Sequence, residues 1–388
     1  MLFRSQSGSP TWVAGFEHVE TTRRGELLEG DGPEALVRAL RDRLRALGAL
    51  GGTPPEPPGL PAAASHTGAP LWVVVEMGRG GPAPITFELL ARAATLGAQL
   101  AAPVDALVIG PGESYAASLC AAGADRVLIA REPSLDPYTT DAHAAVLAAA
   151  ITERAPRLVL LGSTLRGRDL APRVAARLGL GLTGDAIDLD LDGEGCVRQL
   201  KPAFGGTVVV PILSRTRPEM ATVRPGFLTA ARPDPTRPTL IEALPVAAVA
   251  ERVRVVEQHP LPDADASLDA AQLVLGVGRG VGGPDGVAAV RAVAAQLDAA
   301  VVATRDVVDE GWLPRHVQVG LTGRAIAPRL YVALGIGGAM EHMVGLRRAG
   351  TIVAINKSPK AQVWKAADLG LVADVHAVLP LLASALRP

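Results

Sequence analysis

Polar residues follow short apolar runs in the last third of the chain, where they could hold a nucleotide-type cofactor. Thr304 and Arg305 follow one such run, Asn356 ends a second, and Asp374 follows a third. Uninterrupted apolar runs are typical of parallel strands that are covered on both faces. Because ligands bind beyond the carboxyl ends of strands in an open parallel sheet, these residues are expected to share one edge. A guanidinium suits a phosphoryl group, and a carboxylate can accept from a ribose or ribityl hydroxyl.

A glycine-rich loop, G-V-G-R-G-V-G-G over 276–283, follows another run and precedes a helix expected from about Asp285. Glycines at such a position let backbone N–H groups approach a phosphate at a helix N-terminus. The loop does not match the dinucleotide pattern G-x-G-x-x-G, because Val281 stands where the third glycine is required. A tight turn is the alternative, and Arg279 favours the phosphoryl group. An NAD-binding enzyme is therefore the least favoured function.

Two further loops carry groups that could bind a cofactor. The loop 318–323 supplies Thr322, and the glycines beside it allow close backbone approach. The loop 335–338 ends another apolar run and opens a short helix with Glu341 and His342. Both loops are expected at the same edge of the sheet as the strand ends.

Each of these residues has a structural alternative when it is considered alone. Arg305 could form a surface ion pair, and Asp374 could cap a helix that starts at His376. His342 could be a structural or merely exposed histidine. Suitable groups at five strand ends together favour the cofactor site over the separate alternatives.

The elements that must position these groups alternate between strands and helices, which predicts parallel sheets covered on both faces. The sequence therefore predicts an α/β fold with two doubly wound parallel-sheet domains preceded by a small extension. The expected strands of the last domain are 273–276, 300–303, 330–334, 351–355 and 370–373. The expected strands upstream are 71–76, 106–109, 126–130 and 158–161, with helices over 85–100, 114–122, 141–153 and 169–178.

Composition shifts suggest where the domains end. Strand-like runs at 197–200 and 207–213 predict a hairpin, and the proline-rich segment 229–250 predicts a boundary. The first fifty residues look like a separate small unit, with a strand over 12–19 and a helix over 33–47. The expected organisation is an extension of unknown role at 1–50, a linker at 51–70, and domains at 71–250 and 268–388.

Bulk properties exclude several classes of partner. The 388 residues carry a net charge of -1 with a pI near 6.7, which argues against nucleic acid or an anionic membrane surface. Cys120 and Cys196 stand in no metal-ligand spacing, and no disulfide framework is expected. No run approaches 18 apolar residues, so the protein is not expected to be membrane-embedded. A cytoplasmic location is expected.

The segment 273–375 resembles the C-terminal domain of the α subunit of electron transfer flavoprotein. The runs that carry the resemblance are G-R-G, T-R-D-V-V-D-E-G, Q-V-G-L-T-G, A-P-R-L-Y-V-A-L-G-I-G-G-A-M-E-H, I-V-A-I-N-K and D-L-G-L-V-A-D. Runs that resemble the first domain of that subunit are A-P-I-T, S-T-L-R-G-R-D-L-A-P-R-V-A-A-R-L, P-A-F-G-G and A-T-V-R-P-G. The resemblance implies a nucleotide-hydrolase-like first domain and a Rossmann-like FAD-binding domain. It does not cover residues 1–70.

The resemblance also implies an electron carrier rather than an enzyme. It implies a heterodimer with a β subunit and one FAD. Electrons would come from flavin dehydrogenases of the acyl-CoA dehydrogenase type, as in fatty acid β-oxidation. They would pass to electron transfer flavoprotein–quinone oxidoreductase or a similar acceptor.

By position, the resemblance assigns roles to single residues. Arg279 and Thr304 would contact the pyrophosphate region, and Arg305 would lie over the isoalloxazine. Thr322 would bond the central nitrogen of the ring, and His342 a carbonyl at its pyrimidine edge. The pocket would further include Asn356 and Asp374 at the ribityl–adenosine part, and the lining residues Val319, Gly320, Leu321, Gly337, Gly338, Ala339, Met340, Glu341 and Val375.

Arg305, Thr322 and His342 are the groups expected to tune the flavin. A cation about 4 Å from an anionic reduced ring is worth about 4 kcal/mol at most when the effective dielectric constant is near 20. Leu321, Gly337 and Glu341 depart from the glutamine, serine and glutamine usual in the family. These departures motivate one alternative, a nucleotide-binding regulatory protein without redox activity. A bifurcating form that uses NADH and a second flavin in the β subunit is the other alternative.

Overall fold

The computed structural model describes residues 8–18, 23, 25–50, 56–61, 67–78, 80–203, 208–246, 253–259, 268 and 271–387. The chain divides into two compact units. The first unit comprises Met1–His18, Glu56–Phe204 and Val208–Pro260. The second unit comprises Val19–Pro55, Gly205–Thr207 and Leu261–Pro388. Each unit contains its own parallel sheet.

The main sheet of the first unit has seven parallel strands in the order β10-β14-β9-β4-β7-β8-β15. Their bounds are β4 (Leu71–Val74), β7 (Val104–Ile109), β8 (Arg126–Ala130), β9 (Leu158–Gly162), β10 (Leu182–Ala186), β14 (Glu219–Val223) and β15 (Ile241–Leu244). The chain runs outward from β4 through β7 to β8 and then returns to β9 on the other side of β4. The strand order therefore reverses between β4 and β9.

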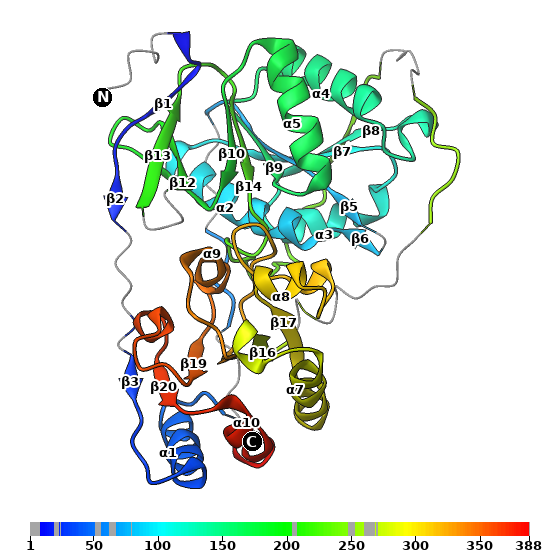
Figure 1. Cartoon of the computed structure of the whole chain (residues 1–388). Helices are drawn as coiled ribbons and strands as arrows, with labels where there is room; N and C mark the ends of the chain where they lie inside the picture. The colour runs from blue at the N-terminus through cyan, green and yellow to red at the C-terminus, as the bar shows by residue number, and fades with distance from the viewer. Residues whose placement is uncertain are drawn as a thin grey trace. The chain divides into compact units, whose positions relative to one another are not determined.

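Helices cover both faces of this sheet (Figure 1). They are α2 (Pro84–Leu100), α3 (Ala116–Ala121), α4 (Thr140–Arg154) and α5 (Leu165–Leu178). Val73 of β4 belongs to the same core as α2 and α3, whereas the adjacent Trp72 belongs to the core under α4 and α5. Successive strand residues point to opposite faces, so one strand serves both cores. Helix α5 begins earlier than residue 169, because the Thr164 hydroxyl accepts from Gly167 N at 3.1 Å and caps it.

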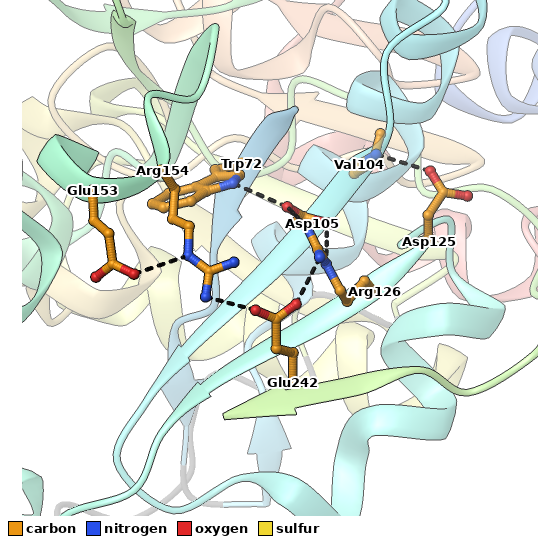
Figure 2. A network of polar contacts seen from close by, with 8 residues as sticks. All are labelled: Trp72, Val104, Asp105, Asp125, Arg126, Glu153, Arg154 and Glu242. Carbon is orange, nitrogen blue, oxygen red and sulfur yellow. Dashed lines mark hydrogen bonds and ion pairs between the residues drawn. The ribbon is translucent and has the colours of Figure 1, made fainter. Parts of the chain in front are cut away.

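The proline-rich segment after residue 229 contributes a strand to the sheet. Glu242 of β15 accepts from Arg126 Nη1 and pairs with Arg154 Nη2, each at 2.6 Å (Figure 2). Arg126 also reaches the buried carboxylate of Asp105, which accepts from the indole N–H of Trp72 at 3.1 Å. Two guanidinium groups thus attach the edge strand to the neighbouring elements.

A second sheet in the first unit is antiparallel. It contains β11 (Asp188–Leu191), β12 (Val197–Ala203) and β13 (Val208–Ser214), which confirms the predicted hairpin. Two short strands, β1 (Thr11–Val13) and β2 (Glu17–His18), pair along β13 in place of the single strand predicted over 12–19.

The sheet of the second unit has six parallel strands in the order β17-β16-β18-β19-β20-β3. Their bounds are β3 (Glu26–Leu27), β16 (Leu273–Val277), β17 (Ala300–Ala303), β18 (Leu330–Leu334), β19 (Thr351–Asn356) and β20 (Leu369–Val372). All five predicted strands of this region are confirmed. The strand order reverses between β16 and β18, because β17 lies on the other side of β16.

The first fifty residues do not form a separate unit. Helix α1 (Pro33–Ala46) buries Leu40 and Leu44 in the core of the second unit, together with residues of α10 (Val375–Ala385). Arg23 forms an ion pair with Asp368 and a hydrogen bond to the Gly350 carbonyl at 3.1 Å. Because β1 and β2 join the first unit, the expected small domain is replaced by segments that extend both units.

Candidate functional site

Glycine loops meet where the strand order of the second unit reverses. Gly278 N donates to Leu334 O at 2.9 Å, and Gly280 N donates to Gly335 O at 3.0 Å. A Cβ added to Gly280 would lie 2.7 Å from the Gly335 Cα, so no side chain fits between these backbones. The loops after β16 and β18 are therefore joined through their main chains at the carboxyl edge of the sheet, where open α/β sheets bind ligands.

Arg279 stands in the first of these loops, before helix α7 (Pro284–Leu297). Gly282 and Gly283 have φ of 83° and 137°, values that favour glycine, and they turn the chain into the helix. Arg279 is exposed, and its side chain has no hydrogen bond or ion pair with the described residues. Its guanidinium group is thus available to an anion from outside.

Thr304 and Arg305 follow β17. Thr304 N donates to Val277 O at 3.0 Å, and Thr304 occupies the N-cap position of α8 (Arg305–Asp309). Arg305 Nε pairs with Asp309 Oδ2 at 3.1 Å, and their side chains are 67% and 62% exposed. The surface ion pair considered for Arg305 is therefore present. Such exposed pairs are worth about 0–1 kcal/mol, so little energy opposes another use of the guanidinium.

The loop 318–323 presents the hydroxyl of Thr322. The buried Gln318 donates from Nε2 to Thr322 Oγ1 at 2.8 Å, while Thr322 itself is exposed. A hydroxyl that accepts one hydrogen bond still has its own proton to donate, so Thr322 can act as a donor toward a ligand. Gly320 has φ of 131°, and an added Cβ would lie 2.2 Å from the Glu341 carbonyl oxygen. Leu321 N donates to that same oxygen at 2.5 Å.

His342 lies inside the protein rather than at its surface. Its Nε2 lies 2.8 Å from the Tyr331 hydroxyl, and its Nδ1 lies 3.0 Å from the Val319 carbonyl oxygen. Burial lowers the pKa of His342 to about 4, although the Val319 carbonyl opposes this shift. Both ring nitrogens are engaged, so the predicted bond from His342 to a flavin carbonyl finds no unoccupied ring nitrogen in this arrangement.

The loop after β18 combines an open glycine with a crowded one. A Cβ on Gly337 would meet nothing within 4 Å, whereas one on Gly338, with φ of 89°, would lie 2.1 Å from Val363 N. Ala339 is the N-cap of α9 (Met340–Met343), on which Glu341 is exposed and Met340 half-buried. Gly337 therefore borders open space and Gly338 fixes the loop.

Asn356 ends β19, and Asp374 follows β20 as the N-cap of α10. Asn356 Nδ2 donates to Ile336 O at 2.9 Å, and its Oδ1 accepts from Ser358 N at 2.9 Å. Asp374 Oδ1 accepts from His376 N at 2.8 Å, so the helix-cap alternative for Asp374 is also present. Asp374 is exposed, and its carboxylate retains further acceptor capacity. Val375, beside it, is buried.

The predicted site residues thus all belong to strand ends, loops or short helical turns that follow the strands of one sheet. This edge fits a dinucleotide-type group: glycine backbones pack closely along it, Gly337 borders open space, and two exposed guanidinium groups and a hydroxyl lie beside it. Sequence reasoning missed Tyr331 and the role of Gln318. The only signal for Tyr331 was an aromatic residue inside an otherwise aliphatic strand.

No helix within the described ranges is long and apolar enough to cross a membrane. Within the same ranges, no three or more His, Cys, Asp or Glu residues are grouped so that they could hold a metal ion.

The fold and the glycine-lined edge define a two-unit α/β protein that binds a nucleotide-type cofactor in its second unit. Comparison with known families is specific. The Electron transfer flavoprotein domain matches residues 71–249, and the Electron transfer flavoprotein FAD-binding domain matches residues 267–347.

Curated relatives agree with the domain matches. The Electron transfer flavoprotein subunit alpha of Thermoanaerobacterium thermosaccharolyticum is 38% identical over 316 residues, which is 80% of this chain and 96% of that protein. That of Bacillus subtilis is 35% identical over 81% of this chain and 96% of its own length. The Acryloyl-CoA reductase electron transfer subunit beta of Anaerotignum propionicum is 32% identical over 82% of this chain and 95% of its own length. The chain belongs to the electron transfer flavoprotein α-subunit family, an electron-transfer family, and its cofactor is FAD.

Proposed function

We propose that this chain is the α subunit of a heterodimeric electron transfer flavoprotein. In this role it takes electrons from flavin dehydrogenases of the acyl-CoA type through FAD and delivers them to a quinone-reducing or similar acceptor. The observation that carries the proposal is the second unit's carboxyl edge, where loops after five consecutive strands present glycine backbones and polar groups together. The names of the relatives support pairing with a second subunit.

The residues proposed to hold FAD divide by chemistry. Arg279 and Thr304 serve the pyrophosphate, while Asn356 and Asp374 serve the ribityl–adenosine part. Arg305 supplies positive charge to the ring, and Thr322 a hydroxyl donor oriented by Gln318. Bound FAD supplies the redox chemistry, and the protein binds it, orients it and sets its electrostatic surroundings. The proposed lining residues are Val319, Gly320, Leu321, Gly337, Gly338, Ala339, Met340, Glu341, His342 and Val375.

The test is to co-express the full chain with a β subunit and to record the absorbance spectrum of the purified complex. Flavin bands that bleach when a substrate-reduced acyl-CoA dehydrogenase is added are the expected result. A flavin-containing complex that no such dehydrogenase reduces would contradict the donor assignment. A complex that takes up no added FAD would contradict the function itself and leave the regulatory alternative.

The second candidate function is a bifurcating complex that uses NADH and a further flavin in the partner subunit. The relative named as an acryloyl-CoA reductase electron transfer subunit favours a reductive partner of this kind. Two FAD per heterodimer together with NADH oxidation would support it, and one FAD without NADH oxidation would exclude it.

A further inference from the structure

A buried glutamine is hydrogen-bonded to the exposed hydroxyl of Thr322. Gln318 is 3% exposed, and its Nε2 donates to Thr322 Oγ1 at 2.8 Å. Gly323 leaves room for this contact, because an added Cβ there would lie 2.2 Å from the Gln318 carbonyl oxygen and 3.1 Å from its Cγ. A side chain enclosed by the protein thus reaches a group at the surface.

The main chain of Gln318 is held on both sides. Gln318 N donates to Arg315 O at 3.0 Å, and Arg324 N donates to Gln318 O at 2.9 Å. The next residue, Val319, donates its N–H to Ala303 O at 3.0 Å and so ties the loop to β17. The amide of Gln318 therefore extends from a fixed backbone toward Thr322, as a supporting residue of a binding group must.

The direction of this bond determines what Thr322 can offer a ligand. A glutamine amide has two N–H donors at one end and a carbonyl acceptor at the other. Since the N–H end meets Thr322, the hydroxyl oxygen accepts and its own hydrogen is left to donate. An acceptor at the same place would take that hydrogen, and the hydroxyl would then present only lone pairs to the ligand.

We propose that Gln318 is a positioning residue that keeps the hydroxyl hydrogen of Thr322 free for the central nitrogen of the flavin ring. This inference rests on the proposed function, because it concerns bound FAD. The amide at position 318 thereby sets how strongly the site prefers a ring with an acceptor at that atom. Gln318 acts through Thr322 rather than by its own contact with the ring.

The first experiment compares FAD with 5-deaza-FAD, in which a C–H group replaces the central nitrogen. Both dissociation constants are measured on the full chain co-expressed with a β subunit and stripped of flavin. The ratio of the 5-deaza-FAD constant to the FAD constant reports the bond to that nitrogen. Gln318→Met keeps the length of the side chain but cannot donate, and it should lower the ratio about fivefold, equivalent to about 1 kcal/mol. An unchanged ratio would overturn the proposal.

Gln318→Glu separates the direction of the bond from the packing of the side chain. At pH 8 an ionised carboxylate can only accept, so it should take the Thr322 hydrogen and lower the ratio further than Gln318→Met does. In a Thr322→Val background neither substitution should change the ratio, since one residue acts through the other. A ratio that still falls in that background would overturn the proposal, as would a Gln318→Glu ratio equal to that of the unmodified chain.

The second experiment does not require FAD. The side-chain amide of Gln318 is observed by nitrogen–proton NMR on the flavin-free complex with this chain ¹⁵N-labelled, and Gln318→Glu identifies its signal. The signal of the bonded amide hydrogen should move upfield in Thr322→Val, because the acceptor is lost. A signal that does not move would overturn the proposal, even if Gln318→Met does not fold.

The matched control is Gln199→Met in β12 of the first unit. Gln199 is 0% exposed, so the same chemical change is made at another buried glutamine. This variant should leave both dissociation constants unchanged. An unmodified complex that binds neither cofactor would contradict the proposed function. A complex that binds both, with a ratio that does not respond to Gln318→Met, would overturn this inference alone.

Discussion

The carboxyl edges of the two parallel sheets are built in opposite ways. In the first unit the edge is closed by the chain's own charges: Glu76 accepts from the Thr164 hydroxyl at 2.6 Å, and Asp185 pairs with Arg168 at 2.9 Å and Arg224 at 3.3 Å. In the second unit the corresponding edge is formed by glycine backbones with exposed polar side chains beside them. The same strand–helix alternation thus produces one filled edge and one open edge.

The difference shows that a reversal in strand order does not by itself make a ligand site. The order of the first sheet reverses between β4 and β9, where Glu76 and Thr164 lie. The Glu76 carboxylate accepts a hydrogen bond from Thr164, the N-cap of α5, and so supplies negative charge where a phosphate would otherwise bind. Burial raises the pKa of Glu76, although the Thr164 hydroxyl and Arg166 oppose the shift. In the second unit the loops after β16 and β18 instead meet through the main chains of Gly280 and Gly335.

The largest expected effect on stability comes from substituting Gly338, which packs against the main chain of Val363. Gly338→Ala places a Cβ 2.1 Å from Val363 N at a residue with φ of 89°. Overpacking against the main chain and an unfavourable φ together should lower the free energy of unfolding by about 3 kcal/mol or more. Gly337→Ala is the matched control, since its Cβ would meet nothing within 4 Å. Urea unfolding of both variants makes the comparison, and equal losses would show that the loop is not rigidly packed.

The next effect comes from the buried histidine of the second unit. The folded-state pKa of His342 is about 4 and the ordinary value is 6.5. Below pH 6.5 the unfolded chain therefore binds a proton that the folded chain does not, and stability falls as the pH drops from 6.5 to 4. The shift corresponds to about 3 kcal/mol.

Urea unfolding at pH 7 and pH 4.5 measures this dependence. His342→Gln should lose that part of the decrease, although other groups of the protein still titrate. A variant with the same pH dependence as the unmodified chain would show that His342 is not buried as a neutral ring.

Much of the second unit could be predicted from the sequence. Uninterrupted apolar runs such as 330–334 predict strands that are buried on both faces. The polar residues after these runs mark the strand ends, because the apolar pattern of the sequence stops there. The proline-rich segment concealed β15, because its attachment depends on Glu242 meeting Arg126 and Arg154, which lie far away in the sequence. The burial of His342 could not be predicted from the sequence either, since only tertiary packing brings Tyr331 and Val319 to its ring.

A smaller loss is expected from the charged network that closes the edge of the first unit. Burial works against ionisation of Asp185, but the Ser163 hydroxyl and the guanidinium groups of Arg224 and Arg168 lower its pKa below the usual range. Asp185→Asn keeps the shape and tolerates the φ of 62°. It should cost about 1–3 kcal/mol, toward the lower end because Asp185 is 32% exposed.

The control for this change is an exposed ion pair of the same unit. Glu113 pairs with Arg131 at 2.5 Å, and their side chains are 55% and 50% exposed. Glu113→Gln should change the free energy of unfolding by no more than about 0.5 kcal/mol. Equal effects of the two substitutions would mean that the Asp185 network does not hold the first edge closed.

The smallest change in stability is expected at the open edge, from Arg305→Ala. Its ion pair with Asp309 is exposed on both sides, so the free energy of unfolding should change by about 0.5 kcal/mol or less. The midpoint potential of bound FAD should nevertheless fall, because a cation near the reduced ring stabilises it. An upper limit of about 4 kcal/mol corresponds to about 170 mV for one electron.

The control is Arg305→Lys, which keeps the positive charge and should lower the potential less than Arg305→Ala does. If the unmodified chain and both variants have the same potential, Arg305 does not tune the flavin. Stability and potential should thus separate at Arg305, as they must if the open edge is shaped for a ligand and the filled edge for the fold.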